Sequence, residues 1–291
     1  MTTLPPFELH RPGSVAEASR LLDELGDDAV VISGGTELLL VMKLGFAKPP
    51  HLVDIKRIAE LHRIEASGDV LDLGAAVTHR EIERSPVVRE RWPALGAMER
   101  LVGNLRVRNM GTIGGNLCFA DPHSDPATFL LATGGSIVCR RGDDPARELS
   151  IEEFVQGPYR TALEPGELVT AVRVPAPGPG VGIAHDKMSL HERPAVTVTC
   201  VTQVEDGQVS SARVAVGSVG SRPGRAPDAE AALTGAVAGE PGGRAAEAAE
   251  AAATSAEPVK DANGSVEYKR QLVRVLTERC VRAAVERATV A

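Results

Sequence analysis

The segment 175–182, which reads Pro-Ala-Pro-Gly-Pro-Gly-Val-Gly, restricts the fold more than any other stretch of this 291-residue chain. Proline lacks a backbone hydrogen-bond donor and glycine adds conformational freedom, so neither a helix nor a central strand continues through such a sequence. A chain of this length is expected to form two domains. We therefore predict a first domain over 1–176, a linker over 177–182 and a second domain over 183–291.

The beginning of the first domain has the pattern of a helix followed by a buried strand. Ser14 and Glu17 form a capping sequence, apolar residues then recur at helical spacing, and Gly26 ends the predicted helix. The run 29–32 is short, apolar and rich in β-branched residues, which favours a buried strand. After a glycine turn, the apolar run 36–44 predicts a second helix.

The rest of the first domain contains further β-rich runs and one short helix with clear boundaries. Asp125 precedes Pro126, an apolar run and Gly134, so we expect Asp125 to be the N-cap of that helix. Helical structure is also expected over 92–101. Strands are predicted at 52–55, 62–65, 70–77, 136–140 and 168–174, with a turn at 67–69.

The second domain is predicted to be a small antiparallel sheet covered by helices. Two β-rich runs, 195–204 and 209–219, flank the pair Asp206-Gly207, which is favoured in tight hairpin turns. The alanine-rich stretch 245–253 is compatible with either a helix or a loose surface segment. The fold class is therefore α+β. Helices are expected at 228–233 and 266–290.

Composition and charge exclude several classes of function. A net charge of −7 and an aromatic content of 3% argue against nucleic-acid binding. The first residues contain neither a basic segment nor a long apolar run, so we expect no signal peptide, no membrane insertion and a cytoplasmic location. The four cysteines include no Cys-x-x-Cys pair and the seven histidines are dispersed, so we expect no metal in this chain.

Two glycine clusters are candidate binding elements: 33–37, which follows the first buried strand, and 111–116. Paired glycines let consecutive backbone N–H groups point into one concavity, whose natural occupant is an anion such as a phosphate. Either cluster alone is more often an ordinary turn. The stricter patterns of a Rossmann dinucleotide site and a P-loop are absent from the sequence, which disfavours both sites.

The combination of these clusters with four other segments resembles a known family over nearly the whole chain. The family comprises the FAD-binding medium subunits of the molybdenum hydroxylases, such as the carbon monoxide dehydrogenase and bacterial xanthine dehydrogenase types. The matching segments are Ile32-Ser-Gly-Gly-Thr-Glu-Leu-Leu39, Val107-Arg-Asn-Met-Gly-Thr-Ile-Gly-Gly-Asn116, Asp121-Pro-His-Ser-Asp-Pro126, Gly166-Glu-Leu-Val-Thr-Ala-Val-Arg-Val-Pro175, Val214-Ala-Val-Gly-Ser-Val-Gly220 and Tyr268-Lys-Arg-Gln-Leu272.

The resemblance implies a set of FAD-binding residues. The segment Val31, Ile32, Ser33, Gly34, Gly35, Thr36 and Glu37 would wrap the pyrophosphate, and Thr112, Ile113, Gly114, Gly115 and Asn116 would lie against the pyrophosphate and the flavin ring. Asp125 would contact the adenosine portion, a role that is compatible with its being an N-cap. Lys187 and Leu168 would lie near the flavin, although Lys187 read on its own fits a solvated strand residue equally well.

The same resemblance implies the fold and the activity. The first domain would be a two-part FAD-binding domain of the PCMH or vanillyl-alcohol-oxidase-like type, divided near residue 56, and the second a domain of the carbon monoxide dehydrogenase flavoprotein type. The chain would be an oxidoreductase subunit that takes electrons from iron–sulfur clusters on a small subunit, while a molybdopterin-binding large subunit transforms the substrate. A dimer of such heterotrimers is the expected assembly.

Two other functions are compatible with the sequence. Ser33 and Phe119 depart from the common family pattern, and a flavin-free scaffold subunit would tolerate such changes. An independent FAD-dependent oxidoreductase would need a substrate domain of its own, for which the second domain is small. The organic substrate, the terminal electron acceptor and the positions of the subunit interfaces are not encoded in any pattern that we can recognise.

Overall fold

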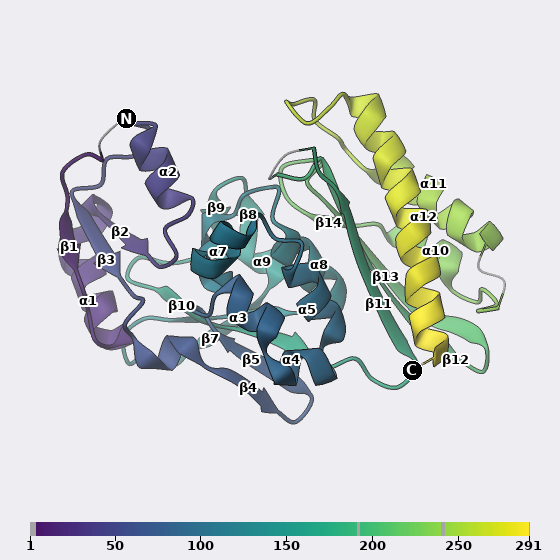
Figure 1. Ribbon diagram of the computed structural model, residues 1–291, viewed down its shortest axis with the longest axis horizontal. Coiled ribbons are helices and arrows are strands. Elements are labelled where there is room, and N and C mark those ends of the chain that lie inside the picture. Colours follow the sequence, from purple (N-terminus) through teal and green to yellow (C-terminus); the bar gives the residue numbers. More distant parts are fainter. Residues whose placement is uncertain (1–3, 191–192, 240–241, 291) are drawn as a thin grey trace.

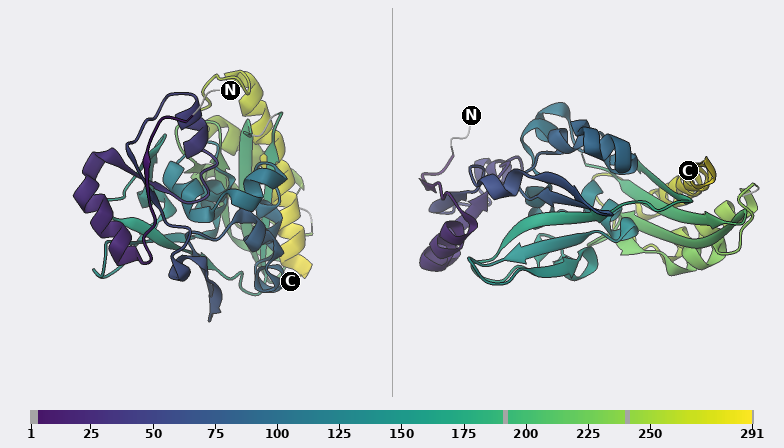
Figure 2. Two further views of the ribbon diagram at one scale, coloured as in Figure 1. Left: turned by 60° about the vertical axis from the view of Figure 1, so that its left-hand side comes forward. Right: turned by 90° about the horizontal axis from the view of Figure 1, so that it is seen from below.

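The computed structural model describes residues 4–190, 193–239 and 242–290 of the chain. These residues form three parts that follow one another along the long axis of the molecule in the order of the sequence (Figures 1 and 2). Each part is built on a β-sheet of its own, and helices cover the sheets. The α+β class predicted from the sequence is confirmed.

The first part is a three-stranded parallel sheet with the order β1-β3-β2. Val15 of α1 shares a core cluster with Val53 of β3, whereas Met42 of α2 packs with Leu52 of the same strand. Because successive side chains of a strand point to opposite faces, the two helices cover opposite faces of the sheet. The elements are β1 (Glu8–His10), α1 (Val15–Leu25), a 3-10 turn (Gly26–Asp28), β2 (Ala29–Ile32), α2 (Leu38–Lys43) and β3 (His51–Asp54).

The middle part is a five-stranded antiparallel sheet with the order β4-β5-β10-β6-β7. Helices cover this sheet (Figure 1). Trp92, which lies between two of these helices, donates its indole N–H to the Val174 carbonyl of β10 at 3.1 Å. The strands are β4 (Ile64–Ser67), β5 (Val70–Gly74), β6 (Ser136–Arg140), β7 (Arg147–Ser150) and β10 (Leu168–Pro175), with a separate ribbon of β8 (Val155–Gly157) and β9 (Arg160–Thr161). The helices are α3 (His79–Arg84), α4 (Pro86–Arg91), α5 (Pro93–Glu99), α6 (Leu105–Met110), α7 (Ile113–Phe119), α8 (Asp125–Thr133) and α9 (Ile151–Phe154), with a 3-10 turn (Ala59–His62) before β4.

The last part is a four-stranded antiparallel sheet with the order β11-β12-β13-β14, and α12 lies along one of its faces (Figure 1). Val273 and Leu276 of α12 pack in one core cluster with Val198 of β12. Although α12 is 25 residues long, no helix of the described residues is both long and apolar enough to cross a membrane. The elements are β11 (Val181–Met188), β12 (Val196–Glu205), β13 (Gln208–Gly217), β14 (Gly224–Arg225), α10 (Pro227–Leu233), α11 (Gly242–Ser255) and α12 (Val266–Val290).

The capping prediction at Ser14 and the turn prediction at Asp206-Gly207 are confirmed. Ser14 accepts a hydrogen bond from the Glu17 N–H at the start of α1, as its capping sequence predicts. Asp206 and Gly207 both have positive φ, 50° and 75°, which is the conformation of a tight hairpin turn. The alanine-rich stretch is the helix α11, so the alternative of a loose segment is wrong.

Two predicted strands have different boundaries in the structure. The strand expected at 62–65 begins only at Ile64, because the preceding residues form a 3-10 turn that places His62 Nε2 2.7 Å from the Lys56 carbonyl. The strand expected at 70–77 ends at Gly74, because the chain there passes directly over Leu61. A Cβ on Gly74 would lie 2.3 Å from the Leu61 carbonyl oxygen.

The prediction that Asp125 caps α8 is wrong by one residue. Ser124 is the N-cap, and its hydroxyl accepts the Ala127 N–H at 3.1 Å. Asp125 is the first residue of the helix, its side chain is buried, and it points away from the helix end to partners described below. Gly134 ends the helix with positive φ, as expected.

The region between the middle and last parts contains no helix or strand over 176–180. β10 ends at Pro175, before the predicted linker, and β11 begins at Val181, inside that linker. The domain boundaries at 176 and 183, and the division of the first domain near residue 56, stay predictions.

Candidate functional site

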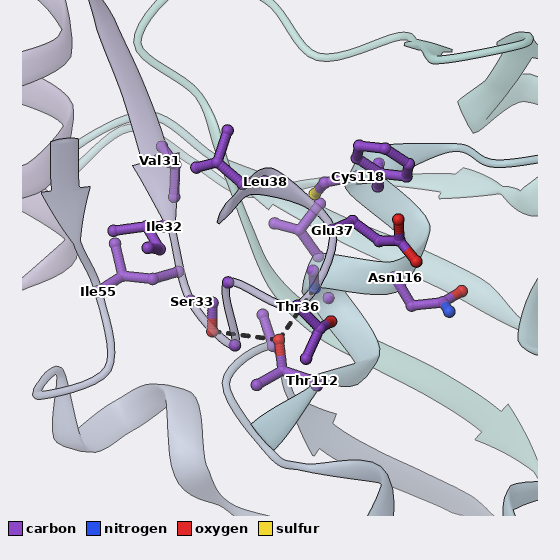
Figure 3. A pocket seen from close by; sticks show the side chains of 18 of the residues that line it. Val31, Ile32, Ser33, Thr36, Glu37, Leu38, Ile55, Thr112, Asn116 and Cys118 are labelled. Atoms are coloured by element: carbon purple, nitrogen blue, oxygen red, sulfur yellow. Dashed lines mark hydrogen bonds between the residues drawn. The ribbon is translucent and has the colours of Figure 1, made fainter. Parts of the chain in front are cut away.

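A cavity of about 300 Å³ lies where the first part of the chain meets the middle sheet. Three segments line most of it: the end of β2 with the loop that follows, the start of α7, and the start of β10. Figure 3 shows that Ser33 and Thr112 point toward each other on its polar side, whereas Val31 and Leu38 extend toward another part of the wall. The cavity therefore combines an apolar wall with a polar, glycine-rich one.

The first glycine loop owes its shape to both of its glycines. Gly35 has a φ of 71°, a conformation that glycine adopts without the steric cost of a Cβ. Gly34 lies against the turn before α7, where a Cβ would be 2.3 Å from the Met110 carbonyl oxygen. The loop that begins at Ser33 thus leaves β2 and passes directly against the second glycine segment.

Thr112 joins the two glycine segments. Its hydroxyl donates to Ser33 Oγ at 3.1 Å and accepts the Gly115 N–H at 3.1 Å, so one side chain caps α7 and holds the first loop (Figure 3). Thr112 and Ser33 are both buried. Because the side chains that link the loops are inside the protein, the relative position of the two backbones is fixed.

The two glycines at the start of α7 have different surroundings. A Cβ on Gly114 would lie 2.6 Å from Ala75 Cβ and 2.7 Å from the Ala75 carbonyl oxygen, so this position allows close packing on the middle sheet. A Cβ on Gly115 would meet only Thr112 Oγ1 at 2.8 Å and Ser33 Cβ at 4.0 Å. Gly115 lines the cavity, so its missing side chain leaves room for a ligand.

A buried histidine–glutamate pair supports the polar wall. His79 Nδ1 lies 2.7 Å from Glu99 Oε2, and the exposed fractions of the two side chains are 2% and 0%. The other carboxylate oxygen, Oε1, has no hydrogen-bond partner. His79 lines the cavity next to Gly111, and among the described lining residues it is the only one with a basic side chain.

Glu167 and Cys118 also line the cavity, and their surroundings shift the pKa of both groups. Burial raises the pKa of the Glu167 carboxyl, but the hydrogen bonds from Arg147 and from the Glu164 backbone outweigh this and leave the pKa below its ordinary value. Burial, with a smaller contribution from Cys139, raises the pKa of the Cys118 thiol to about 12. Cys118 is therefore a neutral thiol near neutral pH and is not an activated nucleophile.

Most of the residues predicted to bind a cofactor surround this cavity. Ile113 is buried beneath it and does not line it. The predicted residues that line it are Val31, Ile32, Ser33, Gly34, Gly35, Thr36, Glu37, Thr112, Gly114, Gly115, Asn116 and Leu168. The lining residues that the sequence analysis missed are Val30, Leu38, Ile55, Ala75, His79, Val107, Gly111, Cys118, Phe119, Leu163, Glu167 and Val169.

Asp125 and Lys187 do not line the cavity but contact each other. Lys187 Nζ donates to Asp125 Oδ2 at 2.6 Å, and His185 Nε2 lies 3.7 Å from Asp125 Oδ1. The Lys187 side chain is only 10% exposed, so its interpretation as a solvated strand residue is wrong. The pair is connected to the cavity through Ser124, whose hydroxyl donates to Asn116 at 2.6 Å.

Arg193, in the loop between β11 and β12, connects all three parts of the molecule beside the cavity. Its guanidinium lies 3.2 Å from Glu37 and 3.0 Å from Asp121.

Phe119, which lines the cavity, packs edge-to-face on Tyr159 at 5.2 Å. Burial raises the pKa of Tyr159, with a further contribution from Asp121, so the phenol stays neutral.

Comparison with protein families decides the affiliation of the chain. Residues 5–177 match the family described as the FAD binding domain in molybdopterin dehydrogenase. The chain belongs to the FAD-binding medium subunits of the molybdenum hydroxylases. Residues 190–284 match the CO dehydrogenase flavoprotein C-terminal domain, which agrees with the second domain type implied by the sequence.

Individual relatives align over almost the entire chain. The carbon monoxide dehydrogenase medium chain of Hydrogenophaga pseudoflava is 35% identical over 282 residues, which cover 96% of this chain and 97% of the relative. The nicotine 6-hydroxylase medium subunit of Paenarthrobacter nicotinovorans is 32% identical over 280 residues, with coverage of 96% and 97%.

Solved structures show the same likeness. Carbon monoxide dehydrogenase from Hydrogenophaga pseudoflava superposes with a TM-score of 0.93 at 36% identity, covering 98% of this chain and 99% of the other. Quinoline 2-oxidoreductase from Pseudomonas putida 86 superposes with a TM-score of 0.92 at 30% identity, with the same coverage.

These matches confirm the family, the fold, the assignment as an oxidoreductase subunit and FAD as the cofactor of its first domain. The cavity fits a dinucleotide with a pyrophosphate, because it has a polar wall of glycine backbone, one basic side chain and a larger apolar wall.

Proposed function

We propose that this chain binds FAD in the cavity and serves as an electron-transfer subunit of a molybdenum-containing hydroxylase or dehydrogenase. Electrons would arrive from iron–sulfur clusters on a partner subunit and leave to a terminal acceptor. The observation that carries the proposal is the direct link between the two glycine segments by Thr112 and Ser33, which sets both backbones against one cavity. Bound FAD accepts electrons singly and releases them in pairs.

The residues of the chain bind and orient, and none need act as an acid or a base. The backbone N–H groups of the two glycine segments suit a pyrophosphate, since no Cβ shields them. Leu168, Val169 and Leu163 give the cavity an apolar wall that excludes water from a flavin ring. Phe119, a departure from the common family pattern, contributes to the lining, so it is compatible with a cofactor site.

We infer that His79 interacts with the pyrophosphate. A carboxylate that is fully buried requires a compensating partner, and the partner of Glu99 is His79. His79 lines the cavity beside Gly111, where the two glycine segments meet, so its ring is placed to hydrogen-bond to a phosphate there. A hydrogen bond to a charged group is worth about 1.5–3 kcal/mol, so its loss lowers affinity roughly 10- to 100-fold.

The subunit partners are part of the proposal. The relatives are named as a medium chain and a medium subunit, which supports a molybdopterin-binding large subunit and an iron–sulfur small subunit as partners of this chain. We propose a dimer of heterotrimers in the cytoplasm. Size determination of the complex purified through a tag on this chain tests the assembly, and a complex without the two partners would contradict it.

The first test is an absorption spectrum of the purified full chain, with the flavin released by denaturation identified as FAD or FMN. A flavin band and about one FAD per chain are expected. A chain that neither retains FAD nor binds added FAD would reject the electron-transfer role and favour a flavin-free scaffold. Substrate turnover by the chain alone would instead favour an independent oxidoreductase.

Ligand fragments test His79 separately. The variant His79→Gln should weaken the binding of FAD and ADP about tenfold or more, while riboflavin, which lacks phosphate, should bind as it does to the wild type. Glu99→Gln should have the same selectivity, because it alters the buried partner that orients the His79 ring. Equal losses for all three ligands would mean that the pair only shapes the fold.

Two matched variants test the assignments of Asp125 and Lys187. Asp125→Ala and Lys187→Met break the same 2.6 Å ion pair, so a purely structural effect is common to both. If the assignments hold, Asp125→Ala weakens ADP binding and Lys187→Met weakens riboflavin binding. Identical losses for every ligand would show that neither side chain reaches the cofactor.

A further inference from the structure

Three metal-ligating side chains meet on the first sheet, outside the FAD cavity. Glu8 and His10 are two residues apart on β1, so their side chains share one face of the strand. His51 on β3 lies opposite Glu8 in the parallel register. Folding thus brings together two histidines that are 41 positions apart in the sequence.

The distances between the ligand atoms fit a single small cation. His10 Nε2 and His51 Nδ1 are 3.1 Å apart, close to the roughly 3.3 Å between two nitrogens bound tetrahedrally to one zinc ion at about 2.0–2.1 Å. The Glu8 carboxylate lies 3.9 Å from His10 Nε2 and 3.7 Å from His51 Nδ1. One ligand atom from each of the three residues falls within 4.8 Å of the others.

The three side chains differ in burial, so the two histidines are held in place whereas the glutamate can move. His10 and His51 have exposed fractions of 18% and 25%, so the sheet holds both rings, whereas Glu8 is 67% exposed and free to turn toward an ion. A hydrogen bond between the two rings would also explain their short contact. That arrangement leaves the carboxylate beyond hydrogen-bonding distance of both nitrogens, while an ion between the rings gives it a ligand position.

We propose that Glu8, His10 and His51 bind one divalent ion of the zinc class, with water in the remaining position. Two imidazoles and one carboxylate suit zinc, nickel or copper and do not suit magnesium, which prefers oxygen ligands. We predicted no metal in this chain because it contains no metal-binding sequence pattern, and a metal at this site would contradict that prediction. This site is independent of the proposed function.

The ion would link an edge strand to the interior of the sheet. β1 is three residues long and pairs only with β3, so few backbone hydrogen bonds hold it. A ligand that binds the folded state and not the unfolded one raises the stability of the fold. Zinc should therefore raise the melting temperature of the chain and slow amide exchange in β1.

Calorimetric titration of the metal-free full chain with zinc chloride tests the site. We expect about one equivalent of zinc to bind, and magnesium chloride not to compete. His10→Gln and His51→Gln should each abolish this binding, and Glu8→Gln should weaken it several-fold. His62→Gln, which alters a histidine on another element, should bind zinc as the wild type does. FAD content, measured in parallel, should be equal in all variants.

The same titration can reject the site. Zinc binding that survives both histidine substitutions, or that falls equally in His62→Gln, would mean adventitious binding by surface histidines and would overturn the proposal. If a variant does not fold, X-ray absorption at the zinc edge of the wild-type chain decides instead. Two imidazole ligands per zinc support the site, and an all-oxygen shell rejects it.

Discussion

The two glycine pairs of the cavity look alike in the sequence but do different work in the structure. In the first pair, Gly34 allows contact with the Met110 backbone and Gly35 allows a positive φ, so both glycines shape the chain itself. In the second pair both glycines line the cavity, but Gly114 packs on Ala75, whereas Gly115 has only Thr112 and Ser33 nearby. A Gly-Gly sequence therefore does not by itself show which glycine makes room for a ligand.

The largest expected effect is the loss of unfolding free energy in Gly34→Ala. In Gly34→Ala the new methyl group would lie 2.3 Å from the Met110 carbonyl oxygen, and backbone atoms cannot turn aside as a side chain can. We expect a loss of about 3 kcal/mol or more of unfolding free energy, because overpacking typically costs 1–3 kcal/mol even where repacking is possible. Urea unfolding checks it. A loss below 1 kcal/mol would show that the two loops are free to separate.

Gly115→Ala should affect binding and spare folding. Its methyl group would meet the Thr112 hydroxyl but no backbone, and it would occupy space at the cavity. We expect FAD affinity to fall about tenfold, equivalent to about 1.4 kcal/mol, with a much smaller change in unfolding free energy of the flavin-free chain. Fluorescence titration with FAD and urea unfolding measure the two quantities. If Gly115→Ala lost as much stability as Gly34→Ala, the two glycine pairs would not differ in their roles.

Thr112→Val should lower both the unfolding free energy and the FAD content of the chain, each by a smaller amount. It removes the N-cap of α7 and the hydrogen bond to Ser33, and the loss of a cap typically costs about 1 kcal/mol. Ser14→Ala removes the cap of α1 away from the cavity and is the matched control. Both variants should lose similar stability in urea, and only Thr112→Val should lose FAD. Equal FAD contents would show that the link between the loops is dispensable.

The smallest effect concerns Glu167 and pH. Its folded pKa lies below the ordinary value of 4.5, so the charged form adds stability above that pH and loses it as the pH falls through the lower folded value. The stability difference between the wild type and Glu167→Gln should therefore be constant near pH 7 and shrink below about pH 4.5. Urea unfolding from pH 7 to pH 3 measures it. A difference that grows on acidification would contradict the sign of the shift.

Local signals explain what was predicted from the sequence. The caps at Ser14 and Gly134 and the turn at Asp206 are set by neighbouring residues, and these predictions are confirmed. The bounds of the strands predicted at 62–65 and 70–77 depend on where the chain meets another segment, as at Gly74 and Leu61, and were wrong. The short helices over 105–119 were not predicted, since each is only six or seven residues long.

Tertiary contacts explain what was missed in the site. His79 and Glu99 are 20 residues apart on different helices, and no spacing rule predicts that they pair. The cap of α8 was assigned to Asp125 because this residue precedes Pro126 and an apolar run, but Ser124 is the cap and the Asp125 carboxylate pairs with Lys187. Resemblance to a family supplied the residues that we propose bind the cofactor in the glycine segments, where pattern alone left an ordinary turn as the commoner interpretation.

The position of Arg193 sets an order of events during synthesis. Val169 is the last described residue that lines the cavity, and Arg193, which joins the three parts through Glu37 and Asp121, follows 24 residues later (193 − 169). At about 5–20 residues per second, the ribosome adds Arg193 roughly 1–5 s after it has made every lining residue. The growing chain thus holds a complete set of cavity residues before the contact that joins the last part to them exists.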